Sequence, residues 1–332
     1  MTTNALTSQQ LPWHEAQRRQ WQQQRRLDKI PHAVLLTGPA GLGKRQFAHY
    51  LAQTLVCTTT NAQAPCGQCR ACRLMDTGSH PDRHAIAPED TFIKVDAIRA
   101  LIHKTNLTAE HWQVFLIDQA EAMHPSAANA LLKTLEEPAP NTMLILSSAE
   151  PQQLPATIRS RCQIITFHPV ATTEAIQWLA DQQPGISWEP VLALAGGAPL
   201  LAIQLLATKR LEQIQQWVDY LSKLRLGQEQ PMPVVKALAE QPLSQVLDDM
   251  LYICYDIAYL AAQAEAAQTK QRLYLPTEVV KLTALTKHIH QVKLHHFIAQ
   301  LHTYKAQQPN NLNPVMVIEK MLACWEALTN NA

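Results

Sequence analysis

The sequence has no apolar run long enough to cross a membrane and no apolar leader at its start. No stretch approaches the roughly 18 consecutive apolar residues of a transmembrane helix. The polar first 26 residues also lack the hydrophobic segment of a secretory signal peptide. We therefore expect a cytoplasmic protein with no membrane contact. In that compartment, its seven cysteines are expected to be thiols or metal ligands rather than disulfides.

A strong net charge is missing as well. The chain has 28 Lys and Arg against 27 Asp and Glu, which gives a formal net charge of +1 at pH 7. This balance gives no sign of a broadly basic nucleic-acid surface, although it leaves DNA contact through a subset of faces open. Hydrophobic residues make up 47% of the 332 residues. A chain of this length exceeds one ordinary core and predicts two or three domains.

Glycine is scarce, with nine residues in the chain, yet three of them fall within positions 38–43. The stretch from Val34 to Arg45 reads VLLTGPAGLGKR, a short buried strand followed by the spacing of a phosphate-binding loop. Such a loop needs glycines because its backbone N–H groups turn inward around phosphate oxygens, at backbone angles that a Cβ would obstruct. The candidate nucleotide-binding residues of the loop are Gly38, Gly41, Gly43, Lys44 and Arg45.

The last two of these residues define the expected chemistry. Lys44 would neutralise the outer phosphates, and the helix that begins there would direct its positive N-terminal end toward them. Loops that hold Mg²⁺ have Ser or Thr after the lysine, because the hydroxyl is a ligand of the ion, but this chain has Arg45. The pattern indicates a nucleotide-binding loop whose chemistry has been altered.

A second apolar run, Gln113–Ile117, ends at Asp118. A strand there would place the Asp118 carboxylate beside the loop, where it could hold Mg²⁺ through water. The next position is commonly a Glu that activates the attacking water in P-loop ATPases, but here it is Gln119, whose amide cannot accept that proton. Glu121 is a weaker substitute. A third run, Thr142–Ser148, ends in two serines that would lie near a γ-phosphate or only close the strand.

Four cysteines crowd into the segment that follows the first helix. Their spacing is C-x8-C-x2-C-x2-C, formed by Cys57, Cys66, Cys69 and Cys72. Four thiolates can close the tetrahedral coordination of Zn²⁺ and leave no open catalytic position. The alternative is a redox pair with incidental buried cysteines, which a lone C-x-x-C would fit equally well. We predict a structural zinc site in an insertion at residues 57–72.

Strands and helices alternate over residues 33–167, which predicts a mostly parallel sheet with helices on both faces. Ligands of such sheets bind at the carboxyl ends of the strands, where Lys44, Asp118 and Ser147 would all lie. Short helices with Pro and Gly breaks follow, and the chain is helical from about residue 208. We predict three domains, at residues 1–167, 168–207 and 208–332.

Taken together, the motifs identify a family. The segments GPAGLGK, FLIDQAEAM and NALLKTLEEP, the cysteine insertion, and the tripeptide Ser160-Arg161-Cys162 resemble the AAA+ clamp-loader subunits of bacterial DNA polymerase III. The resemblance is strong over residues 31–162 and weaker beyond them. It implies an α/β P-loop (AAA+) domain with a mostly parallel sheet, followed by a small helical lid domain and an all-α collar domain that oligomerises.

The resemblance also implies partners. Clamp loaders are hetero-pentamers of motor subunits (tau/gamma), a delta subunit and a rigid stator, which use ATP to load a sliding clamp on primed DNA. This chain is most similar to the stator, which would contribute Arg161 as an arginine finger to the ATP of the neighbouring motor subunit. Ser160 and Cys162 would position that arginine. On the alternative interpretation, Arg161 only caps the sheet or pairs with a surface carboxylate.

Three hypotheses for function follow. The leading one is a stator within the DNA-directed DNA polymerase III holoenzyme, whose own loop hydrolyses no ATP and whose ATP binding is doubtful. The second is an active motor ATPase of the tau/gamma kind, with Glu121 or another carboxylate as the base. The third takes the cysteine cluster as a DNA-reading zinc finger, which is the weakest because only Arg70 and Arg73 accompany it.

Overall fold

The computed structural model describes residues 7–59, 65–88, 92–105, 112–225, 228–263, 273–287, 289–307 and 312–328. Residues 60–64 of the predicted zinc insertion therefore lie outside the described residues. The chain divides into two compact units, Met1–Val170 and Ala171–Ala332. A further division near residue 207 stays a prediction.

The first unit is built on a five-stranded sheet in the order β2-β3-β4-β1-β5, in which every pairing is parallel. The strands are β1 (Ala33–Thr37), β2 (Arg83–Ile86), β3 (Gln113–Ile117), β4 (Thr142–Ser148) and β5 (Gln163–Thr166). Every residue of β1, β3 and β4 is buried, as expected for continuous apolar runs in the middle of a covered parallel sheet. The predicted fold class is confirmed for this unit.

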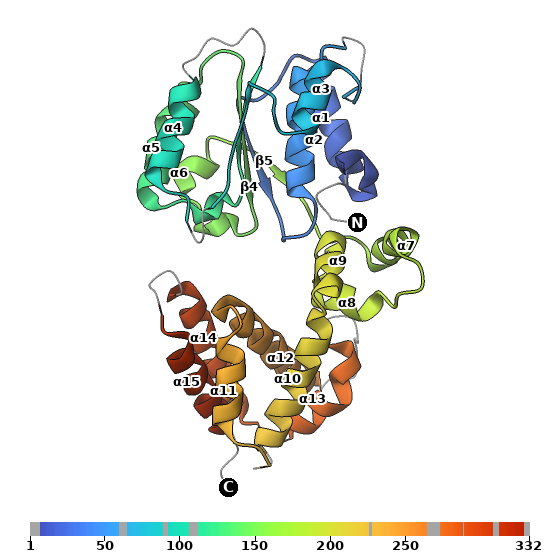
Figure 1. Ribbon diagram of the computed structural model, residues 1–332, viewed down its shortest axis with the longest axis vertical. Helices are drawn as coiled ribbons and strands as arrows, with labels where there is room; N and C mark the ends of the chain where they lie inside the picture. The colour runs from blue at the N-terminus through green and yellow to red at the C-terminus, as the bar shows by residue number, and fades with distance from the viewer. Residues whose placement is uncertain are drawn as a thin grey trace. The chain divides into compact units, whose positions relative to one another are not determined.

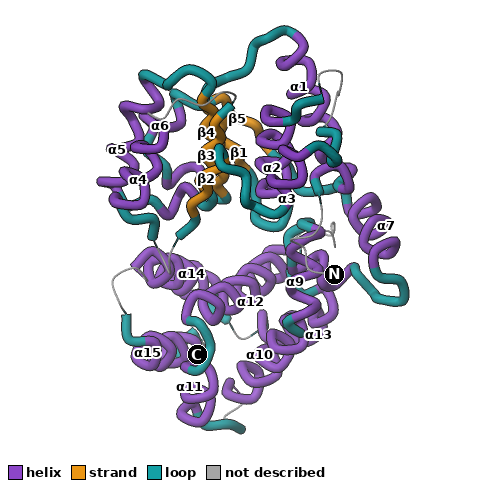
Figure 2. Tube along the Cα trace, turned by 45° about the horizontal axis from the view of Figure 1, so that its top comes forward, coloured by secondary structure: helices purple, strands orange, loops and turns teal. Residues whose placement is uncertain are grey.

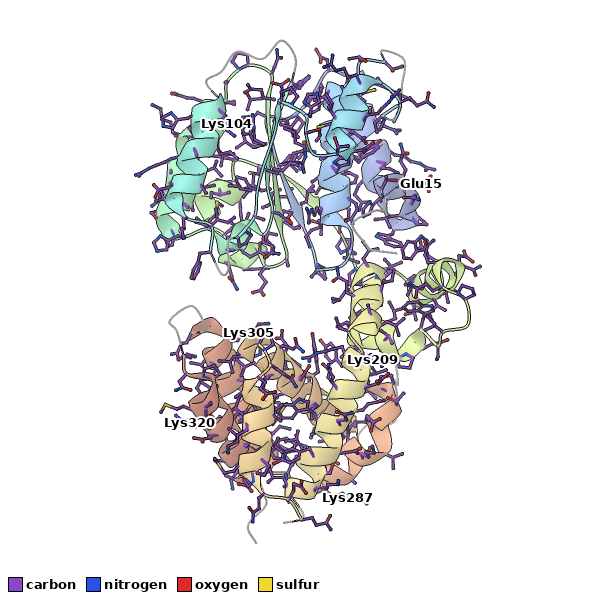
Figure 3. The ribbon with its side chains drawn as sticks, in the orientation of Figure 1. Glu15, Lys104, Lys209, Lys287, Lys305 and Lys320 are labelled. Atoms are coloured by element: carbon purple, nitrogen blue, oxygen red, sulfur yellow. The ribbon has the colours of Figure 1, made fainter. Side chains whose placement is uncertain are left out.

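Helices cover both faces of the sheet (Figures 1 and 2). One face carries α1 (Glu15–Arg26), α2 (Lys44–Val56) and α3 (Arg70–Asp76), and the other carries α4 (Val95–Thr105), α5 (Pro125–Glu136) and α6 (Ala156–Arg159). Short 3-10 helices lie at Ser8–Gln10, Pro12–His14, Ala120–Ala122 and Pro151–Gln153. Side chains fill the layers between sheet and helices, while Glu15 on α1 and Lys104 on α4 lie on the outer sides of the unit (Figure 3).

The second unit is entirely helical in its described residues. Its helices are α7 (Thr172–Gln182), α8 (Glu189–Leu194), α9 (Pro199–Ala207), α10 (Arg210–Arg225), α11 (Pro231–Ala239), α12 (Leu243–Gln263), α13 (Val279–Thr286), α14 (Gln291–Gln307) and α15 (Pro314–Glu326), with a 3-10 turn at Pro276–Glu278. Leu194 of α8 belongs to the same apolar core as residues of α10 to α15. The predicted helical character of this region is confirmed.

Two polar contacts organise the helical unit. Arg210 at the start of α10 forms a buried ion pair with Asp249 of α12, with 2.5 Å between Nη2 and Oδ1. Asn313 caps α15, because its side chain accepts hydrogen bonds from the backbone amides of Val315 (3.0 Å) and Met316 (3.4 Å). Among the described helices of the whole chain, none is long and apolar enough to span a membrane.

Candidate nucleotide loop, cysteine cluster and surface arginine

The three glycines of the candidate loop all adopt left-handed backbone angles. Between the end of β1 and the start of α2, the φ angles of Gly38, Gly41 and Gly43 are 134°, 77° and 87°. A Cβ at Gly38 would lie 2.2 Å from the carbonyl oxygen of Phe167, so no other residue fits there. The turned backbone that the glycine spacing predicts is therefore present at the carboxyl end of β1.

Lys44 is held against the loop that it follows. Its Nζ donates hydrogen bonds to the carbonyl oxygens of Gly38 (2.5 Å) and Pro39 (2.8 Å). Burial lowers the pKa of the Lys44 ammonium, and the nearby carboxylates of Glu121 and Asp118 oppose that effect. The structure thus brings Lys44 and Asp118 close to one another, as the strand order predicts.

Asp118 is engaged by its own surroundings. It follows β3, and its Oδ1 accepts hydrogen bonds from the hydroxyl of Ser147 and from the backbone amide of Gln119 at 3.2 Å. Gln119 has a left-handed backbone, with φ of 51°. Glu121 is also engaged, because its Oε1 accepts a hydrogen bond from the amide of Ala149 at 2.9 Å. The carboxylates of Asp118 and Glu121 therefore both accept hydrogen bonds from residues at or next to the carboxyl ends of β3 and β4.

The start of the chain packs directly on the loop, which sequence reasoning missed. The indole Nε1 of Trp13 donates to the carbonyl oxygen of Leu42 at 3.0 Å, and Nε2 of His14 lies 2.7 Å from the same oxygen. A Cβ on Gly43 would lie 2.5 Å from Leu11 Cδ1 and 2.8 Å from His14 Cε1. No local pattern could reveal these contacts, because the partners are 28 or 29 residues apart in the sequence.

The buried position of His14 determines its protonation state. Burial lowers the pKa of His14 to about 4, against a small opposing effect of its hydrogen bond to Leu42. The imidazole is therefore neutral at pH 7, and Nε2 carries the proton that it donates to the Leu42 carbonyl. Its ring also packs edge-on against Phe47 of α2, with 5.5 Å between the ring centroids.

The four cysteines predicted as metal ligands come together. All four Sγ atoms lie within 4.8 Å of one another, and those of Cys66 and Cys72 are 3.9 Å apart. A tetrahedral Zn²⁺ with Zn–S bonds of about 2.3 Å separates its sulfurs by about 3.8 Å, so the cluster fits this ion. None of the seven cysteines, all of which lie within the described residues, forms a disulfide.

The environment of the cluster already favours one thiolate. A hydrogen bond with Thr59, together with the amides of Cys69 and Gln68, lowers the pKa of Cys66 to about 5. Burial instead raises the pKa of Cys72, which lies on α3. A bound divalent cation would favour the thiolate form of every ligand.

Sequence comparisons place the chain in a family. The family model described as DNA polymerase III, delta subunit matches residues 13–171. DNA polymerase III subunit delta' of Pseudomonas aeruginosa is 33% identical over 335 residues, which cover 96% of this chain and 97% of the relative. The chain belongs to the DNA polymerase III subunit delta' family. The family resemblance inferred from the motifs is thereby confirmed.

Other relatives match shorter parts of this delta' family member. DNA polymerase III subunit delta' of Haemophilus influenzae is 39% identical over 202 residues, 57% of this chain and 61% of the relative. DNA polymerase III subunit tau of Bacillus subtilis is 37% identical over 150 residues, 45% of this chain and 26% of tau. The similarity along the full length is therefore to delta', and the similarity to tau is partial.

Arg161 lies on the surface of the first unit in this delta' family member. Its Nη2 is 2.7 Å from Oε1 of Glu136, the last residue of α5, and the side chains are 36% and 50% exposed. Its Nη1 donates to the carbonyl oxygen of Thr157 (3.0 Å) and to Oγ of Ser160 (3.4 Å). The pairing with a surface carboxylate that the alternative interpretation expects is therefore present.

Cys162 is partly buried and packs against the core of the first unit. Burial raises the pKa of Cys162 to about 12, so the side chain stays a neutral thiol. A role for Cys162 in positioning Arg161 stays a prediction.

Proposed function

We propose that this delta' family member is the non-hydrolysing stator subunit of a DNA polymerase III clamp loader. Arg161 carries the proposal, because its guanidinium is partly exposed on a short turn and contacts Glu136 and Thr157 at the surface of its own unit. In the assembled complex it would donate hydrogen bonds to the γ-phosphoryl oxygens of ATP bound by the neighbouring motor subunit. Arginines supplied in trans in this way accelerate phosphoryl transfer by about 10³–10⁵-fold.

The loop of this chain would turn over no ATP itself. Arg45 supplies no hydroxyl for Mg²⁺, and Gln119 cannot act as a base. Lys44 and the three glycines still offer an anion-binding turn, so the loop could hold a nucleotide without hydrolysing it. The engagement of Asp118 by Ser147 supports the same view, because that carboxylate already has a partner.

The four cysteines would hold one structural Zn²⁺. Cys57, Cys66, Cys69 and Cys72 fill all four tetrahedral positions, which leaves none for a substrate or water. The ion would therefore supply no chemistry beyond cross-linking the segment between α2 and α3. We assign it a role in local folding.

The partners follow from the stator role. The helical unit would join tau/gamma motor subunits and a delta subunit in a cytoplasmic hetero-pentamer, and the complex would act on the sliding clamp and primed DNA. In this assignment, the chain contributes to the DNA-directed DNA polymerase III holoenzyme without an active site of its own.

Steady-state phosphate release from Mg-ATP by the purified chain tests the proposal, with Lys44→Ala as the control. We expect no turnover above that of the Lys44→Ala chain. Turnover that Lys44→Ala abolishes would overturn the stator assignment and would identify an active motor.

The motor ATPase is the second candidate, because of the partial similarity to tau. It would require a carboxylate to activate water in place of Gln119. Glu121 is the nearest candidate in sequence, but its carboxylate accepts the amide of Ala149 at 2.9 Å. A motor would therefore have to break this hydrogen bond during each cycle. Glu121→Gln would abolish turnover in a motor and change nothing in a stator.

A further inference from the structure

A cavity of about 730 Å³ lies beside the phosphate loop, between the sheet and the helices α2 and α3. Its volume is in the range of small-molecule sites. Among the described residues that line it, none belongs to the loop at 38–44, but Arg45, Asp118 and Ser147 do line it, so the cavity adjoins the candidate nucleotide site. It reaches from Asp118 and Ser147 at the carboxyl ends of β3 and β4 to Arg83 at the start of β2.

The floor of the cavity is apolar and flat. Ala85, Leu116 and Ile145 all line it, and they are cross-strand partners in one row of β2, β3 and β4. Because residues directly opposite each other in neighbouring strands point to the same face, this row presents a continuous surface to the cavity. Ala85 is exposed, so helices leave this part of the sheet face uncovered.

Two arginines border the floor without an anionic partner. Arg45 lies in the first turn of α2, and Arg83 is the first residue of β2. Within the described residues, neither guanidinium makes a hydrogen bond or ion pair, and the buried Nε of Arg83 has no acceptor. By contrast, the exposed Arg99 of the same unit faces Asp96, with 3.6 Å between Nη1 and Oδ1.

No carboxylate among the described residues forms an ion pair with the guanidinium group of Arg45 or Arg83. Burial and the nearby Arg45 lower the pKa of Arg83. Two carboxylates, Asp118 and Asp76, also line the cavity, and each has a partner other than these arginines. Asp118 accepts from Ser147, and Asp76 accepts from Gln53 at 2.7 Å and lies 3.1 Å from Nε2 of His49. A half-buried cation without a partner is costly unless a ligand supplies the counter-charge.

We propose that this cavity binds a phosphate monoester or diphosphate without a metal ion. Arg45 and Arg83 would hold the phosphate oxygens, since the planar guanidinium fork matches them in two parallel hydrogen bonds. The organic part of a monoester would lie on the row formed by Ala85, Leu116 and Ile145. Gly78 leaves room at the far wall, where even an added Cβ would lie 3.5 Å from Nη1 of Arg83. The site is independent of the stator assignment.

Isothermal titration of the full-length chain with pyrophosphate, without added divalent cations, tests the proposal. We expect saturable binding that Arg83→Met weakens at least tenfold and that the matched control Arg99→Met leaves unchanged. Ala85→Phe fills the cavity from an exposed position without removing a charge, and we expect it to weaken pyrophosphate binding to a similar extent. This second variant keeps the test decisive if Arg83→Met fails to fold.

Two further outcomes would overturn the proposal. If Lys44→Met abolishes pyrophosphate binding while Arg83→Met does not change it, the anion occupies the loop and not the cavity. If pyrophosphate does not bind, or if Arg99→Met weakens it equally, the cavity is no anion site. Titration with AMP and with inorganic phosphate distinguishes a phosphate monoester from a bare phosphate. The apolar row should strengthen the binding of the monoester, whereas a bare phosphate has no organic part to contact it.

Discussion

At the scale of single residues, the phosphate loop depends on side chains from the start of the chain. The Leu42 carbonyl accepts from Trp13 and lies in hydrogen-bond reach of His14, so one backbone oxygen joins the loop to the segment before α1. Leu11 and His14 also occupy the space that a side chain at position 43 would need. The shape of the loop is therefore maintained by packing as well as by its own glycines.

The neutral His14 makes stability depend on pH. Its pKa is about 4 in the folded chain, below the ordinary value of 6.5, so the unfolded chain binds the proton more readily. The contribution of the neutral His14 to the free energy of unfolding is fully present above about pH 6.5 and is lost as the pH falls toward 4. NMR titration should find the imidazole neutral down to about pH 4, and His14→Gln should reduce the loss of unfolding free energy between pH 7 and pH 5. An imidazole that titrates near 6.5 in the folded chain would contradict this prediction.

Gly43 and Gly185 have similar backbone angles but different surroundings, so Ala substitutions at the two positions can be compared to test the packing on the loop. Their φ angles are +87° and +85°, but an added Cβ meets Leu11 and His14 at Gly43 and nothing within 4 Å at Gly185. Substitution by Ala should cost both positions about 1 kcal/mol of backbone strain. Gly43→Ala should lose a further 1–3 kcal/mol, roughly, from overpacking. Urea unfolding of both variants measures the difference, and equal losses would show that the segment before α1 does not press on the loop.

At the scale of elements, α3 depends on support from outside itself. It has seven residues, too few for a helix that is stable alone. Cys69 caps its N-terminus, and Gln53 of α2 donates to the Cys72 carbonyl (3.3 Å) and to Asp76 (2.7 Å). A metal in the cysteine cluster would add a cross-link at the same end. We therefore expect the order of α3 to follow metal occupancy.

Metal analysis of the purified chain should find about one zinc per molecule. Cys66→Ser removes a ligand and should lower both the zinc content and the hydrogen-exchange protection of α3. Cys324→Ser is the control, because Cys324 is partly buried in the core of the helical unit and is not one of the four clustered cysteines. Full zinc content in Cys66→Ser, or unchanged protection of α3 after chelation, would show that the cluster is not a structural metal site.

At the scale of the whole molecule, the proposed function requires a neighbouring subunit. Each unit has its own apolar core, and the similarity to delta' of Pseudomonas aeruginosa extends over 96% of the chain. Yet the residue with the clearest proposed role, Arg161, has no substrate within its own chain. Its effect can be measured only in the assembly.

In a reconstituted clamp loader, Arg161→Ala should lower by one the number of ATP molecules that each complex hydrolyses in the fast phase. Only the motor subunit beside this chain would lose its finger, and its rate should fall by about 10³-fold or more. Arg161→Lys should recover little, because an ammonium lacks the planar fork. Gel filtration of both complexes verifies assembly, and Arg99→Ala is the exposed control.

Glu136→Gln separates the two interpretations of Arg161. If the arginine is a finger, loss of its surface partner should leave the fast phase nearly intact. If the arginine serves only the surface ion pair, Glu136→Gln and Arg161→Ala should have the same small effect, since exposed pairs contribute at most about 1 kcal/mol.

The local sequence pattern was sufficient to predict two of the strands and the cysteine cluster. The apolar runs at Gln113–Ile117 and Thr142–Ser148 became strands with those bounds. The spacing of the cysteines predicted their convergence. These features depend on neighbours within a few residues, where periodicity and backbone preference decide the conformation.

The sequence by itself determined the fold class, the turned loop and the cysteine cluster of this protein. Only the tertiary structure decided that His14 lies on Leu42, that Glu136 holds Arg161, and that Arg83 borders the same cavity as Arg45. Each of these arrangements brings together side chains from different parts of the chain. The register of the parallel strands and the packing of helices on their faces place such side chains together, and no pattern along the chain records that placement.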